Sequence, residues 1–382
     1  MTRKLYYEDS HLAVFTATVI SCARAETGYE VILDRTAFFP GGGGQAPDTG
    51  MLGLARVTGA KERDGEVIHF TDKPLTEGAV VEGRLNWNQR HRRMQNHSGE
   101  HLLSGVIHQR FGYENVGFHM GEDCVTVDYS GELTAGQIYE VELECNLAIG
   151  KNVPVRCEFP DRNTLNAMDY RSKKELSGDV RIVTVEGYDV CACCAPHVSR
   201  TGEIGMVKLL TWTRHRGGTR ITMVCGMDAW EDDCARCANL TSISNLLSVK
   251  PLEASRAVAR LWKEHEALKQ KLKEANRKLT EQKIKELRPT QGNLLFFEPD
   301  LDMLCLRDLI NAAMEQCSGI AAGFSGGDGE GYHYILGSKT VDLRAKAKEI
   351  NAAIDGKGGG SAEMIQGTAN ADEATIRACF ET

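Results

Sequence analysis

The sequence contains no long hydrophobic run, and this absence excludes a membrane-spanning helix. Within its 382 residues, no apolar stretch approaches the roughly 20 residues that a helix needs to cross a bilayer. The first residues, Met1–Asp9, also lack the apolar segment of a signal peptide. An apolar content of 42% and a charged content of 26% are typical of soluble globular proteins. We therefore expect a cytoplasmic protein that makes no contact with a membrane.

The chain also lacks an excess of positive charge and a regular pattern of cysteines. Its net charge of −8 argues against a protein that coats nucleic acid, but it does not exclude local basic patches. The 13 cysteines are odd in number and irregularly spaced. We expect reduced thiols, a few of which serve as metal ligands.

A run of four glycines, Gly41–Gly44, lacks the features of a nucleotide-binding loop. No Lys-Ser or Lys-Thr pair follows it, as a phosphate-binding loop requires. Pro47 and Asp48 stand where a dinucleotide-binding motif would begin its helix. Two interpretations stay open: a tight glycine turn, or a backbone that lets a bulky substrate come close, with Gln45 as a hydrogen-bonding arm.

Two short segments, about ninety residues apart, together predict a metal site. His97 and His101 are four residues apart, which places both imidazoles on one face of a helix. Cys193 and His197 have the same spacing, and a thiolate with imidazoles is a ligand set that favours zinc. We predict that these four side chains bind one Zn²⁺ ion.

The residues alone leave two other interpretations of this zinc open. His97-Ser98-Gly99-Glu100-His101 is also the H-x-x-E-H string of a family of zinc peptidases, in which Glu100 would activate water. Those peptidases use a glutamate as third ligand, whereas this chain offers a Cys-x3-His pair. The zinc would be purely structural if four protein ligands close the site. Cys191 and Cys194 are alternative thiolates.

The periodicity of the sequence predicts an α+β chain of several domains. Residues 1–88 read as short strands of a small β-barrel that carries the glycine motif. Residues 89–228 read as an α+β zinc-binding core, and residues 229–290 as a helical hairpin or coiled-coil arm. Residues 291–382 read as a C-terminal α/β domain.

The arm is predicted from a heptad pattern that ends at Pro289. Its positions, which alternate in steps of four and three, are Ala254, Val258, Leu261, His265, Leu268, Leu272, Ala275 and Leu279. The partner of this apolar seam could be a helix of the same chain or a second copy, so a homodimer is one prediction.

Basic residues and one glycine loop are our candidates for contacts with nucleic acid. The first group precedes the histidine pair, the second lies in a basic turn, and the third lies in the C-terminal domain. The candidates are Arg90, Arg92 and Arg93; Arg214 and Arg216; and Lys357, Gly358 and Gly359.

These motifs together resemble the alanyl-tRNA editing proteins, which are free-standing relatives of the editing half of alanyl-tRNA synthetase. The resemblance rests on the two ligand pairs, on Gly43-Gly44-Gln45 with Asp48 and Gly50, and on Thr201-Gly202-Glu203-Ile204-Gly205. The loop Gly356–Gly360 resembles the DHHA1 domain that ends the synthetase, so the chain is similar to the long form. We see no amino-acid-activating domain ahead of the barrel and no Asp-His-His motif.

The resemblance implies a hydrolase that deacylates tRNA(Ala) mischarged with serine or glycine. A pocket sized for alanine cannot exclude glycine and rejects serine only weakly, so a second sieve is needed. Zinc would act as a Lewis acid, and Gln45 would position the substrate. Glu100 is our own candidate for proton transfer. Pro196 stands where the synthetases carry threonine, which leaves the choice between serine and glycine open.

The main alternative is a tRNA-binding or scaffold protein whose zinc is only structural. Under either interpretation, we expect the arm and residues 291–382 to hold the body of the tRNA or a second protomer.

Overall fold

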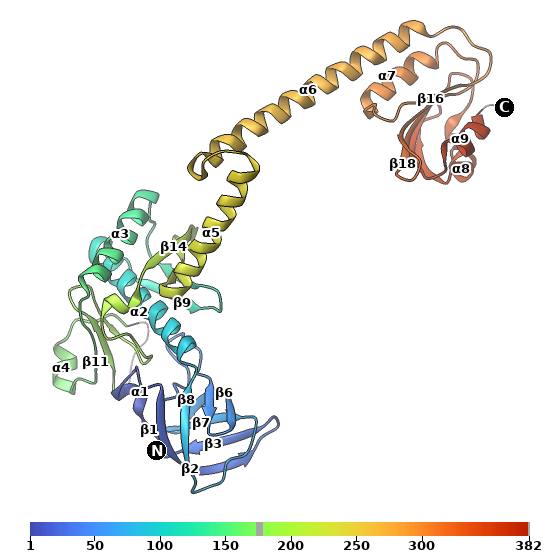
Figure 1. The fold of residues 1–382 in the computed structure, drawn as a ribbon. Helices are drawn as coiled ribbons and strands as arrows, with labels where there is room; N and C mark the ends of the chain where they lie inside the picture. Colours follow the sequence, from blue (N-terminus) through green and yellow to red (C-terminus); the bar gives the residue numbers. More distant parts are fainter. Residues whose placement is uncertain (173–178, 381–382) are drawn as a thin grey trace. The chain divides into compact units, whose positions relative to one another are not determined.

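The computed structural model describes residues 1–172 and 179–380 of the chain, which folds into two compact units. The first unit is Met1–Leu240 and the second is Thr241–Thr382. Both units combine helices with sheets (Figure 1), which confirms the expected mixed α+β, multidomain class. The finer division into four domains stays a prediction. No helix among the described residues is long and apolar enough to span a bilayer.

The N-terminal strands of the first unit close into a barrel of order β2-β3-β7-β6-β5-β8. Its strands are β2 (Val14–Arg24), β3 (Tyr29–Leu33), β5 (Gly50–Leu52), β6 (Ala55–Arg63), β7 (Glu66–Thr71) and β8 (Val80–Leu85). Ahead of the barrel strands lie β1 (Arg3–Lys4), which pairs with β4 (Arg35–Thr36), and the short helix α1 (Leu5–Glu8). The interior is filled by fully buried aliphatic residues such as Val31, Leu52 and Val57. Closure leaves the barrel strands without free edges.

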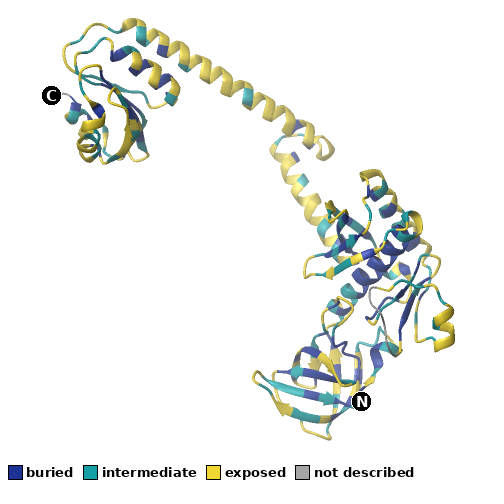
Figure 2. Ribbon diagram, turned by 180° about the vertical axis from the view of Figure 1, so that it is seen from behind, coloured by how far each residue is buried: buried dark blue, intermediate teal, exposed yellow. Residues whose placement is uncertain are grey.

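Helix α2 (Trp87–Phe111) begins directly after the barrel and runs through the interior of the first unit. The side chain of Asn86 caps its start by accepting a hydrogen bond from the Gln89 amide, and Gly112 ends it in a left-handed conformation. Every residue from Met94 to Ile107 is buried, so the helix is dark blue over this stretch in Figure 2. A helix buried on all sides can carry polar side chains only where they have partners, so the partners of its polar residues must be identified.

Two small sheets and further helices surround α2. The sheet of order β14-β15-β10-β9 and the sheet of order β11-β12-β13 are both antiparallel. Their strands are β9 (Asn115–Met120), β10 (Val125–Tyr129), β11 (Val155–Glu158), β12 (Ile182–Val185), β13 (Asp189–Ala192), β14 (Val207–His215) and β15 (Gly218–Cys225). The helices are α3 (Ala135–Lys151), α4 (Arg162–Ala167) and the 3-10 turn η1 (Thr201–Ile204).

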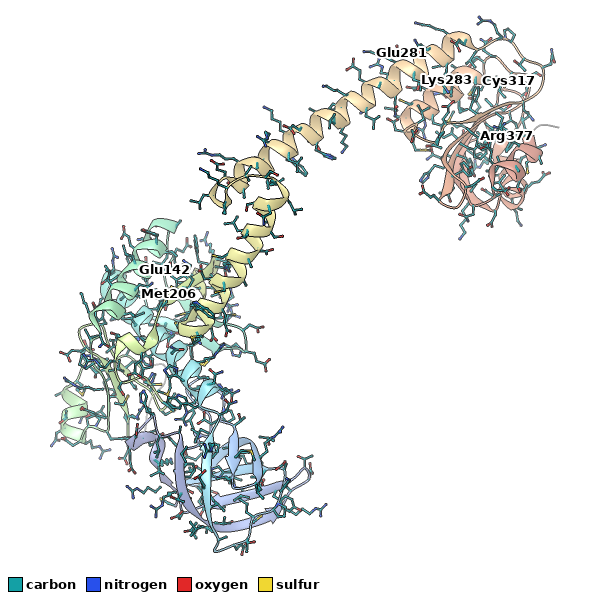
Figure 3. The ribbon with its side chains drawn as sticks, viewed as in Figure 1. Glu142, Met206, Glu281, Lys283, Cys317 and Arg377 are labelled. Atoms are coloured by element: carbon teal, nitrogen blue, oxygen red, sulfur yellow. The ribbon has the colours of Figure 1, made fainter. Side chains whose placement is uncertain are left out.

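Residues 140–145, which alternate like a strand in the sequence, lie inside helix α3. A capping box between Thr134 and Gln137 starts this helix. Val141 and Cys145, four residues apart, face the core, while Glu142 accepts hydrogen bonds from Lys208 (2.6 Å) and the Leu209 amide (2.7 Å) on β14 (Figure 3). The short alternation of apolar residues is compatible with the period of a strand and with that of a helix. The capping box at Thr134 favours the helix.

The second unit contains a long helix and a five-stranded sheet. Helix α5 (Gly226–Leu246) crosses the boundary between the units, and η2 (Pro251–Glu253) leads into α6 (Ala254–Glu286). The sheet has the order β16-β17-β18-β20-β19. Its strands are β16 (Leu294–Phe297), β17 (Ala321–Gly327), β18 (Gly331–Gly337), β19 (Gly356–Gly360) and β20 (Met364–Ala369), with α7 (Met303–Ala313), α8 (Leu343–Ala353) and α9 (Glu373–Phe380) against it. The C-terminal end of α6 packs on α7 through Ile284, and Lys283 forms an ion pair with Glu298 (Figure 3).

Candidate metal centre

The local packing of α2 fixes where its polar residues lie. His97, Ser98, Glu100 and His101 are all buried in consecutive positions of the helix. Gly99, between them, faces β15 so closely that a Cβ there would lie 2.3 Å from the Cys225 sulfur. The glycine therefore lets the helix approach the sheet, and the histidines turn toward the segment that follows β13.

The four residues predicted as metal ligands lie together. One nitrogen of each of His97, His101 and His197 and the sulfur of Cys193 all lie within 4.8 Å of one another. The Cys193 Sγ is 3.5 Å from His97 Nε2, and the ring centroid of His197 lies 4.7 Å from those of both other histidines. The two segments, whose nearest ligands His101 and Cys193 are 92 residues apart in the sequence, thus meet at one point.

Each imidazole is oriented by a hydrogen bond at its Nδ1 atom. The partner atoms are Gln45 Oε1 for His97 (3.1 Å), Asp189 Oδ2 for His101 (3.0 Å) and Ser98 Oγ for His197 (3.2 Å). The amide oxygen of Gln45 and the carboxylate of Asp189 can only accept, which places the proton of His97 and His101 on Nδ1 and leaves Nε2 for the cluster. The Ser98 hydroxyl can donate or accept, so it orients the His197 ring without placing its proton. The Nε2 of His197 is buried and has no hydrogen-bond partner among the described residues. A buried nitrogen of this kind fits a site that holds a metal cation.

The electrostatics of the cluster also favour a cation. Burial raises the pKa of Cys193, but the neighbouring His97 and His197 outweigh it, so the thiol pKa falls well below its ordinary value. Burial lowers the pKa of His197 to about 3. Burial lowers the pKa of His101, but Cys191 and Asp189 raise it by more, so that the pKa lies well above its ordinary value. Surroundings that stabilise a thiolate and an added positive charge also stabilise a bound metal ion.

A cavity of 560 Å³ opens onto three of the four cluster residues and is lined in part by the glycine turn. Gly42 and Gln45 bond each other's backbones in this turn, and Gly41–Gly44 all have positive φ angles. A Cβ on Gly43 would lie 3.5 Å from the Cys193 sulfur, and one on Gly44 would lie 2.4 Å from the Phe118 ring. The structure therefore shows a tight turn that brings bare backbone to the cluster. The approach of a substrate to this backbone stays a prediction.

The two predicted catalytic residues occupy different positions. Gln45 is buried and bonds His97 through its Oε1, while its Nε2 has no hydrogen-bond partner among the described residues. Glu100 lines the cavity and accepts hydrogen bonds from Ser104 Oγ (2.6 Å) and Asn115 Nδ2. Gln45 thus orients the His97 ring, whereas Glu100 lies at the wall of the cavity.

The other thiols near the cluster differ in their surroundings. Cys191 lies with His101 and Asp189 in a second group whose atoms are within 4.8 Å of one another. Cys194 is exposed, and both cysteines line the cavity. Sequence reasoning missed Asp189, because its distance from His101 along the chain gives no sign that the two meet. It also missed Arg171, which donates two hydrogen bonds to Asp189, at 2.8 and 2.9 Å.

The expected phosphate contact of Arg90 is wrong. Its side chain is fully buried, forms an ion pair with Asp48 and donates to the Ala37 carbonyl. Arg92 is engaged by Asp228 (2.7 Å) and Glu231. Only Arg93 of this trio has no carboxylate partner among the ion pairs of the described residues.

The remaining basic candidates lie elsewhere. Arg214, exposed on β14, pairs with Glu132 (2.7 Å), and Arg216 lies in the following turn with a positive φ of 49°. Lys357, Gly358 and Gly359 were expected in a loop but form the edge strand β19, because glycine backbone can pair with β20 as any other backbone does. All three are exposed.

Comparisons with known proteins agree with the sequence resemblance. Residues 180–222 match the model of the threonyl and alanyl tRNA synthetase second additional domain. The alanine–tRNA ligase of Ignicoccus hospitalis is 28% identical over 98% of this chain and 42% of its own length. The alanyl-tRNA editing protein Aarsd1 of Rattus norvegicus is 32% identical over 54% of this chain and 54% of its own, and that of Mus musculus gives the same values. The chain spans about half the length, or less, of these curated relatives. It is thus a homologue of the alanine–tRNA ligases and of the alanyl-tRNA editing proteins.

Proposed function

We propose that the chain is a trans-editing hydrolase that removes serine or glycine from mischarged tRNA(Ala). The observation that carries this proposal is the convergence of three imidazoles and a thiolate at the wall of a cavity. The names of the relatives, alanine–tRNA ligase and alanyl-tRNA editing protein, support the choice of substrate. We propose Zn²⁺ as the metal, because histidine and cysteine together favour it over harder cations.

The size of the cavity supports an ester at the end of a nucleic acid as substrate. Its volume of 560 Å³ lies within the roughly 300–1,000 Å³ of sites for small ligands. Such a cavity has room for an aminoacylated terminal nucleoside and not for the body of a tRNA. The body must therefore lie outside, against other surfaces of the chain.

The residues of the site have different proposed roles in hydrolysis. Zinc, when bound by His97, His101, Cys193 and His197, supplies a Lewis acid for the negative charge that develops on the ester carbonyl. Glu100 lines the cavity and is our candidate to take a proton from the attacking water and return it to the leaving ribose hydroxyl.

Other residues prepare the site without touching the reacting atoms. Gln45 and Asp189 hold His97 and His101 in the tautomer that leaves Nε2 for a metal, and Ser98 orients the ring of His197. The glycine turn lets the ester come close to the cluster. Phe118, stacked on His97 at 5.1 Å between ring centroids, covers one side of that ligand.

The test combines metal analysis with deacylation of Ser-tRNA(Ala) and Gly-tRNA(Ala). We expect one zinc per chain, and we expect His97→Ala and Cys193→Ala to lose both zinc and hydrolysis. His108→Ala is the matched control, because His108 belongs to the same helix but is partly exposed beside Glu114 (3.0 Å). Folded cluster variants with the full rate would contradict the proposal. The relative rates on the two substrates measure the preference that Pro196 leaves open.

A tRNA-binding or scaffold protein with a structural zinc is the second candidate, because four protein ligands can close a zinc site. It predicts that cluster variants lose stability while wild type binds tRNA without hydrolysing the ester. A peptidase is less favoured, because the cluster offers Cys193 and His197 where such enzymes use glutamate.

A further inference from the structure

A second cavity, of 570 Å³, adjoins the glycine turn at Ala46. Helix α2 forms one wall with Gln89, Arg92, Arg93 and Asn96, and the hairpin between β9 and β10 forms another. Arg93 precedes the predicted zinc ligand His97 by four residues, which is about 6 Å along the helix axis. This cavity therefore lies beside the predicted metal centre.

Of two guanidinium groups on α2 at this place, only one pairs with the nearby carboxylate of Asp48. The Nε atom of Arg90 donates to both carboxylate oxygens of Asp48, to Oδ1 at 3.1 Å and to Oδ2 at 2.9 Å. Its Nη2 atom also donates to Oδ2. Arg93, three residues further along the helix, donates only to the carbonyls of Pro47 (2.7 Å) and Ala46 (3.4 Å). No carboxylate of the described residues lies within ion-pair distance of Arg93. One positive charge is therefore left without a partner.

The acidic residues on the walls do not compensate this charge. Asp228 is engaged by Arg92 (2.7 Å) and by the Asn96 amide (2.5 Å). Glu122 is exposed on the hairpin and forms no ion pair with Arg93. Burial lowers the pKa of Arg93, but a guanidinium stays protonated at neutral pH. A half-buried cation that faces a cavity attracts an anion.

Resting on the proposed function, we propose that this cavity binds a backbone phosphate of the RNA strand whose aminoacylated end enters the metal cavity. Arg93 supplies the charge. Gln89, whose Oε1 is occupied by Thr49 Oγ1 (2.9 Å), offers its amide as a further donor, and His119 faces it from the hairpin. A planar guanidinium suits the bidentate recognition of a phosphate. The bound phosphate would fix how far the strand reaches toward the cluster.

The test measures binding of the full-length protein to a non-hydrolysable RNA minihelix that ends in CCA, over a series of salt concentrations. Loss of one phosphate contact reduces the slope of log affinity against log salt by about 1. We therefore expect Arg93→Gln to reduce the slope by about 1 and the affinity roughly tenfold. Arg84→Gln is the matched control, because Arg84 is exposed on the barrel and paired with Glu82 (2.9 Å). It should leave both values unchanged.

A second variant separates the phosphate contact from a disturbed turn, because Arg93 also holds two carbonyls of that turn. Arg93→Lys keeps the charge but loses the planar fork. We expect it to keep the wild-type slope and to lose affinity a few-fold. Zinc content should be that of wild type in both variants. The proposal would be overturned if Arg93→Gln kept the wild-type slope. It would also be overturned if the slope of Arg93→Lys were as low as that of Arg93→Gln, or if Arg84→Gln lost as much affinity as Arg93→Gln.

The outcomes also distinguish this site from the proposed function. If Arg93→Gln reduces the slope by about 1 but wild type does not deacylate Ser-tRNA(Ala), the hydrolase proposal fails and the phosphate site stands. If wild type deacylates the substrate and Arg93→Gln keeps the wild-type slope, only the phosphate site fails.

Discussion

At the scale of single residues, the hydrogen bonds at the three Nδ1 atoms decide which nitrogen faces the cluster. The strongest of these contacts is that of Asp189, because its carboxylate is ionised, buried and held by Arg171. A carboxylate behind a ligating histidine raises the basicity of that ligand. Metal affinity should therefore depend on Asp189 although it is not a proposed ligand of the ion.

We predict that Asp189→Asn lowers zinc affinity about 10- to 100-fold, which is the usual effect of removing such a partner. Competition with a chromophoric chelator measures the affinity directly, without an activity assay. Asp128→Asn serves as control, since Asp128 accepts two hydrogen bonds from Arg220 in the same way, at 2.6 and 2.7 Å, but lies outside the cluster. Equal zinc affinity in wild type and Asp189→Asn would show that the contact has no influence on the metal.

A second residue-scale effect concerns His69, which is completely buried in the barrel. Its Nδ1 donates to the Val31 carbonyl (3.1 Å), and its Nε2 accepts from Thr36 Oγ1 (2.8 Å). Burial lowers its pKa from 6.5 to about 4. The unfolded chain therefore binds a proton between these values while the folded chain does not.

The sign follows from this difference in pKa. The contribution of His69 to the free energy of unfolding is complete above pH 6.5 and is lost as the pH falls toward 4, by about 3 kcal/mol in total. We predict that this loss is absent in His69→Gln. Urea unfolding of both proteins between pH 4 and 7 measures it as the pH dependence of their difference. A difference that does not change with pH would contradict a neutral buried imidazole.

At the scale of elements, the glycine turn and the strand β9 are fitted to each other. Gly44 has a φ of 83°, and the Phe118 ring fills the space that a Cβ would need. Because Phe118 in turn stacks on His97, a change in the turn reaches the cluster through this ring.

We predict that Gly44→Ala slows deacylation and destabilises the fold by about 1–3 kcal/mol, since it adds a collision to an unfavourable backbone conformation. Gly53→Ala is the matched control. Gly53 has a φ of 55°, but no atom lies within 4 Å of the position of its Cβ. Gly53→Ala should therefore be destabilised only by backbone strain, and its deacylation rate should equal that of wild type. If both variants have equal stability and rate, the collision with Phe118 has no effect.

The elements also show what sequence patterns can and cannot predict. The ligand pairs, the helix that carries His97 and the long helix α6 were predictable, because their signals are local spacings. The helix over residues 140–145 was not, because three apolar residues fit both periods. Nor was β19, since a glycine-rich segment has no side-chain pattern and its pairing with β20 is decided by the rest of the sheet. The burial of Arg90 depends on Asp48, 42 residues away, and no local pattern reports such a contact.

At the scale of the whole molecule, the two units have separate hydrophobic cores. The first unit is built around the barrel and α2, and the second around the sheet that includes Phe324 and Tyr334. All residues of the cluster and of both cavities beside it belong to the first unit. The heptad seam of α6 lies in the second, with Leu261, Leu268 and Leu272 exposed.

We predict that a fragment of residues 1–248, which ends after α5, folds cooperatively and binds one zinc. Its Michaelis constant for Ser-tRNA(Ala) should rise while its rate at saturation changes little, because the second unit is proposed to hold the tRNA body. Steady-state kinetics with fragment and full chain make this comparison. An unchanged Michaelis constant would assign the second unit another role, and sedimentation of both proteins would reveal whether that role is pairing of two copies.

The spacing of the proposed ligands along the chain has a consequence for biosynthesis. His97 precedes His197 by 100 residues, and Gln45 precedes both. A ribosome that adds about 5–20 residues per second needs roughly 5–20 s to pass from the first ligand to the last. During this interval the nascent polypeptide presents two histidines without their thiolate partner. If these four residues bind one ion as proposed, its complete ligand set is available only after translation has passed His197.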